Sequence, residues 1–388
     1  MDITIQPRKL SGSVNVIPSK SMAHRYLICA AFADNETDLI CPETSRDMNA
    51  TAHCLNALGA EISRTDVGYH IIPIRNIPRT AILKCHESGS TLRFLLPIVG
   101  AMGIDAVFQM EGRLPERPLS PLWEEMERMG CTLTRPTADA IRCTGKLRAG
   151  EYVIEGNVSS QFITGLLFAT SLIEGECNLR VCGKIESKPY ITMTKEAMKR
   201  FGAPRYHSPG QIIIEGDWSN GAFWLAAQAL GSRLEIHNLD ANSNQGDRVA
   251  ADLIPALQEN LTIDTSDIPD LVPILSIVAA ANRGAVFTNI QRLRLKESDR
   301  VESVIQMIHS LGGIACSTED TLTILGTGLE GGTVHSHHDH RITMSAAIAA
   351  TVCVKPVTIV GAEAVTKSYP KFWEEYRHLG GNYEQHLR

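Results

Sequence analysis

The chain has 388 residues, of which 44% are hydrophobic, and its 37 basic and 43 acidic residues give a formal net charge of −6. This length exceeds one ordinary core, so two domains are expected. The acidic balance argues against a general nucleic-acid-binding protein, which normally carries a basic excess, so any cationic site must be local.

Ten cysteines occur without a CxxC pair, and the first residues, MDITIQPRKL, do not resemble a secretory leader. Both features predict reduced thiols in a cytoplasmic protein and disfavour structural zinc. The longest apolar segment, FLLPIVGAMGIDAVF, is short and contains Pro97 and Asp105, so no membrane-spanning helix is expected.

Six segments are apolar on nearly all faces and rich in Ala, Ser and Gly, which is typical of helices packed inside a domain. Five of them open with Ser or Asp and the sixth, IPDLVPILSIVAAA, has Asp270 close to its start; such residues cap helix N-termini, so a buried helix is predicted at each. In chain order the segments span residues 19–33, 88–102, 159–173, 219–230, 268–281 and 339–352.

An amphipathic segment follows each buried one and closes with a residue that tolerates the left-handed C′ conformation. Asn260 is expected to close the segment at residues 248–263, which completes six copies. Glycine closes the other five, at Gly59, Gly130, Gly202, Gly312 and Gly380.

Short β-like runs surround each pair of helices, among them DLICP, YVIEG and PVTIVG. The pattern therefore predicts six α/β units, each with one buried and one amphipathic helix. Six units divide most simply into two domains of three, and a composition break at residues 212–221 is the expected boundary.

Basic residues stand near the start of every amphipathic helix, where the helix dipole disfavours cations by a few tenths to about 1 kcal/mol. For a single cation, pairing with a nearby carboxylate is the ordinary explanation, as for Arg46 with Asp47 or Arg300 with Glu302. Repeated along the chain, the arrangement indicates helix N-termini gathered around a strongly negative ligand. These cations are Arg46, Arg117, Lys188, Arg248, Arg300 and Lys367, joined by Lys20 and Arg341 on two buried helices.

Nine short motifs stand along the chain: PSKSMAHR (18–25), SGSTLRF (88–94), ERP (116–118), SSQF (159–162), SKPY (187–190), IPD (268–270), LKESDR (295–300), DHR (339–341) and TKSYP (366–370). A single motif of this kind carries little information, whereas nine in order are highly specific. Their order is that of the 5-enolpyruvylshikimate-3-phosphate synthase family, which the chain resembles from about residue 5 to 375.

The resemblance implies a two-domain inside-out α/β barrel, in which each domain holds three βαβαββ repeats with pseudo-threefold symmetry. It implies that residues 1–18 cross over to join residues 217–388 in a C-terminal lobe, while residues 19–216 form the N-terminal lobe. The active site is expected in the interdomain cleft. Composition alone does not show the crossing.

The activity implied is that of a 3-phosphoshikimate 1-carboxyvinyltransferase, which acts in chorismate and aromatic amino acid biosynthesis. The enolpyruvyl group of phosphoenolpyruvate passes to the 5-hydroxyl of shikimate 3-phosphate through a tetrahedral intermediate, and phosphate is released. Two phosphates and two carboxylates in one cleft need many cations and helix N-termini, in keeping with the basic residues above. The resemblance implies no cofactor, metal, nucleic acid or membrane; we expect a cytoplasmic monomer, with glyphosate as a competitive inhibitor.

For phosphoenolpyruvate, the resemblance implies a clamp of Arg117, Arg300 and Arg341, because planar guanidinium groups suit carboxylate and phosphate. Gly89 marks a point where the backbone approaches this ligand closely. The residues carried over to this site are Lys20, Gly89, Arg117, Gln161, Arg300, Arg341 and Lys367.

For shikimate 3-phosphate, the resemblance implies serine hydroxyls at the 3-phosphate, Arg25 with Ser21 at the carboxylate, and Asp270 accepting from ring hydroxyls. Gln161 is expected between the two ligands. The residues carried over are Lys20, Ser21, Arg25, Ser159, Ser160, Gln161, Ser187, Tyr190, Asp270 and Lys296.

Catalysis requires a proton delivered to the methylene carbon of phosphoenolpyruvate while the 5-hydroxyl loses one, and elimination reverses both roles. The candidates are Glu297 and Asp270 as carboxylates, with Lys20 as a proton shuttle whose acidity nearby Arg residues raise. Which group acts at which step stays open.

Three positions depart from the family pattern. Glu87 and Arg292 stand where the family often has Asn, and Ser90 replaces a common Thr. Glu87 either repels phosphoenolpyruvate or points away and caps its helix. The presence of Gly89 favours sensitivity to glyphosate.

Two local patterns have alternative interpretations. The run HSHHDH (335–340) suggests a metal site, but only alternate residues of a strand share a face, so His340 is better explained as part of a helix start. Cys85 could act as a nucleophile, although it lacks an activating motif and a buried structural thiol is favoured.

Three rival functions remain. The sister enolpyruvyl transferases that act on UDP-N-acetylglucosamine carry a reactive Cys in the loop that is MEGRLPERP here, and this loop has none. RNA 3′-phosphate cyclase would need a nucleotidylated histidine and a basic RNA surface, and a non-catalytic binding protein is the least specific alternative. Phosphate release that requires both shikimate 3-phosphate and phosphoenolpyruvate separates all four.

Overall fold

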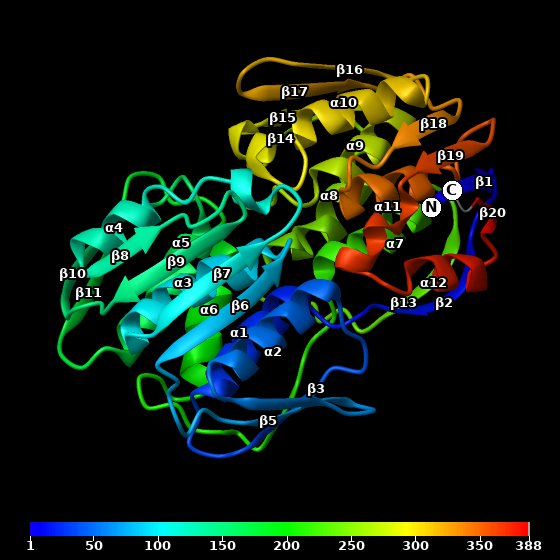
Figure 1. Cartoon of the computed structure of the whole chain (residues 1–388). Helices are drawn as coiled ribbons and strands as arrows, with labels where there is room; N and C mark the ends of the chain where they lie inside the picture. Colours follow the sequence, from blue (N-terminus) through cyan, green and yellow to red (C-terminus); the bar gives the residue numbers. More distant parts are fainter. Residues whose placement is uncertain (387–388) are drawn as a thin grey trace. The chain divides into compact units, whose positions relative to one another are not determined.

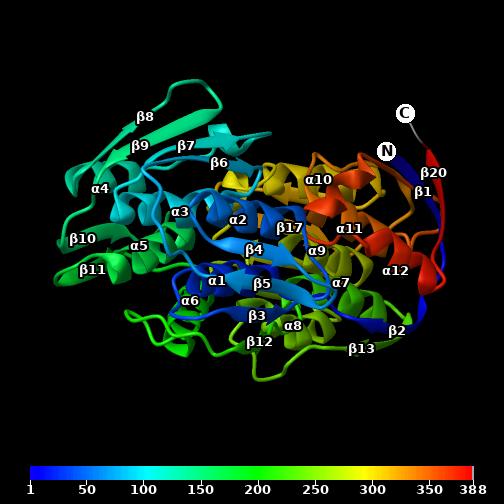
Figure 2. The same cartoon turned by 60° about the horizontal axis from the view of Figure 1, so that its bottom comes forward.

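The computed structural model describes residues 1–386 (Figures 1 and 2). The chain forms two compact units: unit 1 combines Met1–Ile17 with the residues from Glu215 onward, and unit 2 is Pro18–Ile214. Each has its own hydrophobic core. In the described part of the chain, no helix is both long and apolar enough to cross a membrane.

Unit 2 contains two four-stranded sheets and one strand pair. The first sheet has the order β12 (Gln211–Ile213), β3 (Thr37–Ile40), β5 (Gly68–Ile72), β4 (Glu61–Arg64). The second has the order β6 (Thr80–His86), β7 (Asp105–Met110), β9 (Ala140–Gly145), β8 (Cys131–Thr134). The pair is β10 (Gly150–Glu155) with β11 (Cys177–Cys182).

The helices of unit 2 alternate between buried and amphipathic, as the sequence pattern predicts. Those with mostly buried residues are α1 (Lys20–Ala31), α3 (Gly89–Met102) and α5 (Ser160–Leu172). The others are α2 (Arg46–Ala57), α4 (Leu122–Arg128) and α6 (Lys188–Arg200), with the 3-10 helix η1 (Leu114–Glu116) before α4.

Unit 1 repeats this plan. Its first sheet has the order β14 (Leu261–Asp264), β15 (Gly284–Thr288), β17 (Thr321–Leu325), β16 (Ile314–Ser317). Its second has the order β18 (Gly332–His335), β19 (Val357–Val360), β1 (Asp2–Gln6), β20 (Asn382–His386). The strand pair is β13 (Arg233–His237) with β2 (Ser11–Asn15). The blue β1 lies beside the red β20 in Figure 2, so the start of the chain is paired with its end.

The helices of unit 1 are α7 (Trp218–Ala229), α8 (Ala250–Ala256), α9 (Val272–Ala281), α10 (Arg300–Ser310), α11 (His340–Ala349) and α12 (Phe372–His378). The 3-10 helices are η2 (Gly246–Val249), η3 (Gln291–Leu295) and η4 (Ala362–Lys367). In each of the four-stranded sheets formed by residues 1–386, the first two strands pair in parallel and the other two pairings are antiparallel. This recurrence confirms the repeated α/β organisation.

Close helix packing inside unit 2 depends on a glycine. A Cβ on Gly165 of α5 would lie 2.2 Å from the carbonyl oxygen of Arg93 in α3, so a larger residue would push the two helices apart. The small residues noted in the buried segments therefore serve close backbone approach.

Side-chain caps begin five of the six buried helices. Ser19, Ser88, Ser159, Asp217 and Asp339 each accept a hydrogen bond from a backbone N–H of the first turn. For α7 the cap is Asp217, two residues before the predicted Ser219, which lies inside the helix. The prediction is wrong for α9, whose N-cap, Leu271, gives no side-chain cap, because the preceding Asp270 faces cations instead.

The closing glycines have the expected conformation, with φ of 104° at Gly59, 117° at Gly130, 72° at Gly202, 83° at Gly312 and 88° at Gly380. The prediction for Asn260 is wrong, since this residue is not among those with positive φ. Its side-chain amide instead donates to the carbonyl of Arg283 at 3.1 Å.

Candidate active site

The predicted cations divide between two kinds of helix start. Arg46, Lys188 and Arg300 are the first residues of α2, α6 and α10, where they oppose the helix dipole. Arg117, Arg248 and Lys367 lie in or beside the 3-10 helices that precede α4, α8 and α12. In addition, Lys20 is the first residue of α1 and Arg341 the second of α11.

In unit 2, Lys20 contacts a buried carboxylate on the neighbouring helix. Its Nζ lies 3.1 Å from Oδ2 of Asp47 in α2, and the side chains are 16% and 7% exposed. The sequence suggests Asp47 as the partner of Arg46. In the structure Asp47 pairs with Lys20. The acid is thereby fixed beside the start of α1.

Gly89 begins α3 directly beside two arginines. A Cβ there would lie 2.8 Å from Nη1 of Arg117 and 3.4 Å from Nη1 of Arg93. The absent side chain thus makes room for guanidinium groups at a helix N-terminus, an arrangement suited to an anion.

Arg93 lies beside two of the predicted site residues, Gly89 and Gln161, and was missed by the sequence analysis. It is buried; Nη1 donates to Oε1 of Gln161 at 2.7 Å and Nη2 to the carbonyl of Pro118 at 3.2 Å. The amide nitrogen of Gln161 in turn donates to Oγ of Ser90 at 2.9 Å. An arginine inside an otherwise apolar helix was the signal that could have revealed it.

Arg25 is buried in α1 against neutral oxygen atoms. Its Nε donates to Oγ1 of Thr194 at 2.9 Å, Nη1 to the carbonyl of Ser21 at 2.6 Å and Nη2 to the carbonyl of Tyr190 at 2.8 Å. Burial lowers the pKa of Arg25 to about 10, which leaves it cationic at neutral pH. Among the described residues no carboxylate pairs with it, so its charge is available to an anionic ligand.

The predicted serines occupy the starts of α5 and α6. Ser159, which is partly exposed, caps α5, and the buried Ser160 is the first residue of that helix. Ser187 precedes α6 with φ of 55°, an uncommon backbone conformation outside glycine that is often found at functional sites. Hydroxyls and backbone N–H groups at two helix N-termini form a suitable phosphate-binding surface.

In unit 1, Arg300 lies at the centre of three carboxylates and is only 1% exposed. Its Nη1 contacts Oδ1 of Asp270 at 2.5 Å, Nη2 contacts Oε2 of Glu297 at 2.7 Å, and Nε contacts Oδ2 of Asp339 at 2.8 Å. These are the partners of Arg300, in place of the Glu302 that the solvated-face interpretation suggested. A cluster of acids is therefore held around one buried cation.

Asp270 also contacts two further cations. Nη2 of Arg341 lies 3.1 Å from its Oδ2, and Nζ of Lys296 lies 3.5 Å from its Oδ1. Burial would raise the pKa of Asp270, but Arg341, Lys296 and Arg300 together hold it well below its usual range. Asp270 is therefore ionised and, in this state, a proton acceptor rather than a donor.

The ammonium group of Lys296 is more acidic than that of an ordinary lysine. Burial lowers its pKa to about 8, while Asp270 opposes this shift and Arg300 and Arg292 add to it. A pKa close to neutral suits proton transfer. Arg292, one of the departures from the family pattern, thus acts electrostatically on a predicted site residue.

The other predicted positions have simple placements. Lys367 is buried at the end of η4, which packs against α11. The N-cap of α3 is Ser88, and the Glu87 carboxylate lies against Gly112, so a capping role of Glu87 stays a prediction. Burial and the neighbouring Cys54 raise the pKa of Cys85, which favours a structural thiol.

The histidine run adopts strained backbone. His337 and His338 have φ of 51° and 56°, and His340, at the start of α11, is buried. Within residues 1–386, no three His, Cys, Asp or Glu side chains are grouped in a way that could hold a metal ion.

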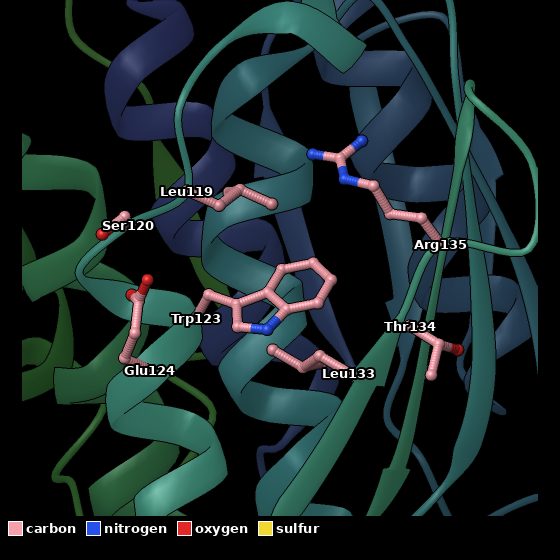
Figure 3. A pocket seen from close by; sticks show the side chains of 7 residues that line it. All are labelled: Leu119, Ser120, Trp123, Glu124, Leu133, Thr134 and Arg135. Carbon is pink, nitrogen blue, oxygen red and sulfur yellow. The ribbon is translucent and has the colours of Figure 1, made fainter.

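A shallow pocket of 590 Å³ on unit 2 contains none of the predicted site residues (Figure 3). Trp123 lies between Leu119 and Leu133, and the Arg135 guanidinium is 5.9 Å from the indole centroid. Ser120, Glu124 and Thr134 complete its lining.

Comparison with known proteins identifies the family. Residues 5–376 match the model of EPSP synthase (3-phosphoshikimate 1-carboxyvinyltransferase). A 3-phosphoshikimate 1-carboxyvinyltransferase of Clostridium kluyveri is 35% identical over 421 aligned positions, covering 99% of this chain and 98% of that protein. One from Clostridium botulinum strain Alaska E43 is 37% identical and covers 98% of each.

The fold is also similar to that of solved EPSP synthase structures. A solved structure of EPSP synthase from Acinetobacter baumannii superposes with a TM-score of 0.78 at 22% identity, covering 99% of this chain and 100% of that one. The inside-out α/β barrel implied by the sequence motifs is the fold of this family. With a family match over nearly the whole length and relatives above a third identity, the chain belongs to the EPSP synthase family.

Proposed function

We propose that this protein transfers the enolpyruvyl group of phosphoenolpyruvate to the 5-hydroxyl of shikimate 3-phosphate and releases phosphate. The observation that carries the proposal is the buried cluster in which Arg300 joins Asp270, Glu297 and Asp339 next to Arg341. It combines guanidinium groups for an anion with carboxylates for proton transfer, and the family membership gives it a substrate pair.

For phosphoenolpyruvate, we propose Arg300 and Arg341 of unit 1 and Arg117 of unit 2 as the clamp. Lys20 and Lys367 are proposed at its phosphate, with Gly89 and Gln161 beside it. The room that Gly89 leaves for the Arg117 guanidinium supports this assignment, because an anion needs cations close to the helix start.

For shikimate 3-phosphate, we propose the serine-bearing starts of α5 and α6 for the 3-phosphate, through Ser159, Ser160 and Ser187. Arg25, which has no described carboxylate partner, is proposed for the shikimate carboxylate. The remaining contacts of this proposal are Lys20, Ser21, Gln161, Tyr190, Asp270 and Lys296.

The proton transfers are assigned to Glu297, Asp270 and Lys20. In the addition step, the 5-oxygen bonds to C2 of phosphoenolpyruvate, the proton of the 5-hydroxyl passes to a base, and C3 gains a proton as the C2–C3 double bond is lost. In elimination, C3 loses a proton and the bond from C2 to the phosphate oxygen breaks. Ionised Asp270 fits the accepting role, and the pKa of about 8 at Lys296 provides a nearby donor.

The test is phosphate release measured with each substrate alone and with both together. Release that requires both supports the proposal, and release with UDP-N-acetylglucosamine in place of shikimate 3-phosphate would favour the sister activity. No release with any pair, from folded protein, contradicts an enzymatic role.

Three further properties belong to the proposal: a monomeric state, a cytoplasmic location and competition by glyphosate for the phosphoenolpyruvate site. A glyphosate titration at fixed shikimate 3-phosphate tests the last of these. Activity unchanged at millimolar glyphosate would contradict it.

A further inference from the structure

A buried carboxylate in unit 1 has no part in the sites described so far. Asp247 lies in η2, between α7 and α8, and is 3% exposed. Its Oδ2 accepts a hydrogen bond from Ser219 in the first turn of α7, while its Oδ1 is buried without a hydrogen-bond partner. Burial of an ionised carboxylate with an unpaired oxygen is strongly disfavoured, so this group holds a proton readily.

The charges that act on Asp247 come from several elements. Asp217 caps α7, Asp270 precedes α9 and Arg341 lies in α11, while Arg248 follows Asp247 in η2. Burial raises the pKa of Asp247 to about 7; Asp270 and Asp217 add to the shift, and Arg341 opposes it. The negative charge of Asp270 therefore opposes ionisation of Asp247, and the positive charge of Arg341 favours it.

Only one member of this pair is held by direct ion pairs. Asp270 contacts Arg341, Arg300 and Lys296 and keeps its negative charge. For Asp247, the described hydrogen bond is with a neutral hydroxyl. The single proton of the pair is thus placed on Asp247.

We propose that Asp247 is a positioning residue for Arg341, and that it must carry its proton for an anionic substrate to bind there. Ionised Asp247 adds a second negative charge near Arg341 and weakens its attraction for an incoming anion. Above neutral pH, binding of the anion at Arg341 therefore transfers a proton from water to the Asp247 carboxylate. The inference rests on the proposed function, in which Arg341 holds phosphoenolpyruvate.

The experiment measures KM for phosphoenolpyruvate between pH 6.5 and 8.5 in the wild type and in Asp247→Asn. Asparagine keeps an acceptor for Ser219 and is neutral at every pH. We expect the wild-type KM to rise about tenfold over this range and that of the variant to change less than about threefold. Titration of the substrate's own phosphate is common to both proteins and cancels in the comparison.

Asp252→Asn is the matched control, because Asp252 lies in α8 and is exposed. It should retain the wild-type pH dependence. Ser219→Ala provides a second variant: it removes the hydroxyl that stabilises ionised Asp247, so the rise in KM should move to higher pH. Equal pH dependence in the wild type and Asp247→Asn, or an unmoved rise in Ser219→Ala, would overturn the inference.

A second measurement needs no substrate. A carboxyl whose folded pKa is raised to about 7 stabilises the fold at low pH and loses this contribution as pH rises from about 4 to 7. The Tm of the wild type should therefore fall more between pH 5 and pH 7.5 than that of Asp247→Asn, and equal falls would contradict the proton on Asp247. Absence of phosphate release would reject the proposed function, yet leave this Tm comparison interpretable.

Discussion

The two units build the same sheet-and-helix plan but surround their key arginines with different groups. In unit 2, Arg25 donates to a hydroxyl and two carbonyls. In unit 1, Arg300 contacts three carboxylates at the start of α10. A repeated fold therefore supports two electrostatic environments: the buried arginine of unit 2 is held by neutral oxygens, and that of unit 1 is neutralised by carboxylates.

The difference has an energetic side. Neutral acceptors leave Arg25 with a desolvated charge, which an anionic ligand would compensate. The three acids around Arg300 are already compensated, so an anion bound there must compete with them. Removing one partner of such a buried group costs about 3–5 kcal/mol, since the others are left uncompensated.

The largest expected effect is on turnover, from Lys20→Met in unit 2. We expect kcat to fall about 10²–10⁴-fold, because a group proposed to move a proton and contact the phosphate is lost. Phosphate release checks it. Lys84→Met, which removes an exposed lysine of the same unit, is the control. Wild-type turnover by Lys20→Met, with an unchanged Tm, would remove Lys20 from the mechanism.

The next effect contrasts the two arginines directly. Arg300→Met should lower the free energy of unfolding by about 3–5 kcal/mol, because it leaves buried Asp339 and its neighbours without their cation. Arg25→Met removes hydrogen bonds to neutral groups and should cost about 1–3 kcal/mol. Urea denaturation measures both. Equal losses would show that the carboxylates around Arg300 add nothing to its structural role.

A pH effect is expected from Lys296. Its pKa of about 8 means that the ammonium charge is present at pH 7 and is lost as pH rises through 8. The KM for shikimate 3-phosphate should therefore rise about tenfold from pH 7.5 to 9 in the wild type. Lys296→Arg keeps the charge and should remove this rise. The same rise in both proteins would exclude Lys296 as its cause.

The smallest effect is expected at Gly89. Alanine would place a methyl group 2.8 Å from Nη1 of Arg117 and displace that guanidinium slightly. We expect a rise of up to about tenfold in KM for phosphoenolpyruvate and none for shikimate 3-phosphate. The Tm should be unchanged or higher, because alanine favours a helix. A loss of stability with both KM values unchanged would contradict this account.

Local chemistry made much of the fold predictable. The capping residues Ser19, Ser88, Ser159 and Asp339 and the five closing glycines act within one turn of chain, so their roles follow from neighbouring residues. Asn260 was predicted wrongly because its amide has a partner in Arg283, outside its own helix. Tolerance of a conformation does not require that conformation.

The site was less predictable because its contacts join distant positions. Lys20 meets Asp47, Arg93 meets Gln161, and Arg300 meets Asp339, 39 positions away. Periodicity reports which face of a helix is buried, but it does not report what lies opposite that face. The residues Arg93 and Asp247 were missed for this reason, since burial of a charge becomes informative only when its partners are known.

The placement of the first strand affects how the protein can be made. β1 is an inner strand of its sheet, and both of its neighbours, β19 and β20, are synthesised after residue 356. Unit 2 can therefore complete its core during translation. Strand β1 stays unpaired on both edges until the last part of the chain has been synthesised. A chaperone that shields extended, unpaired strands would be most useful in this interval.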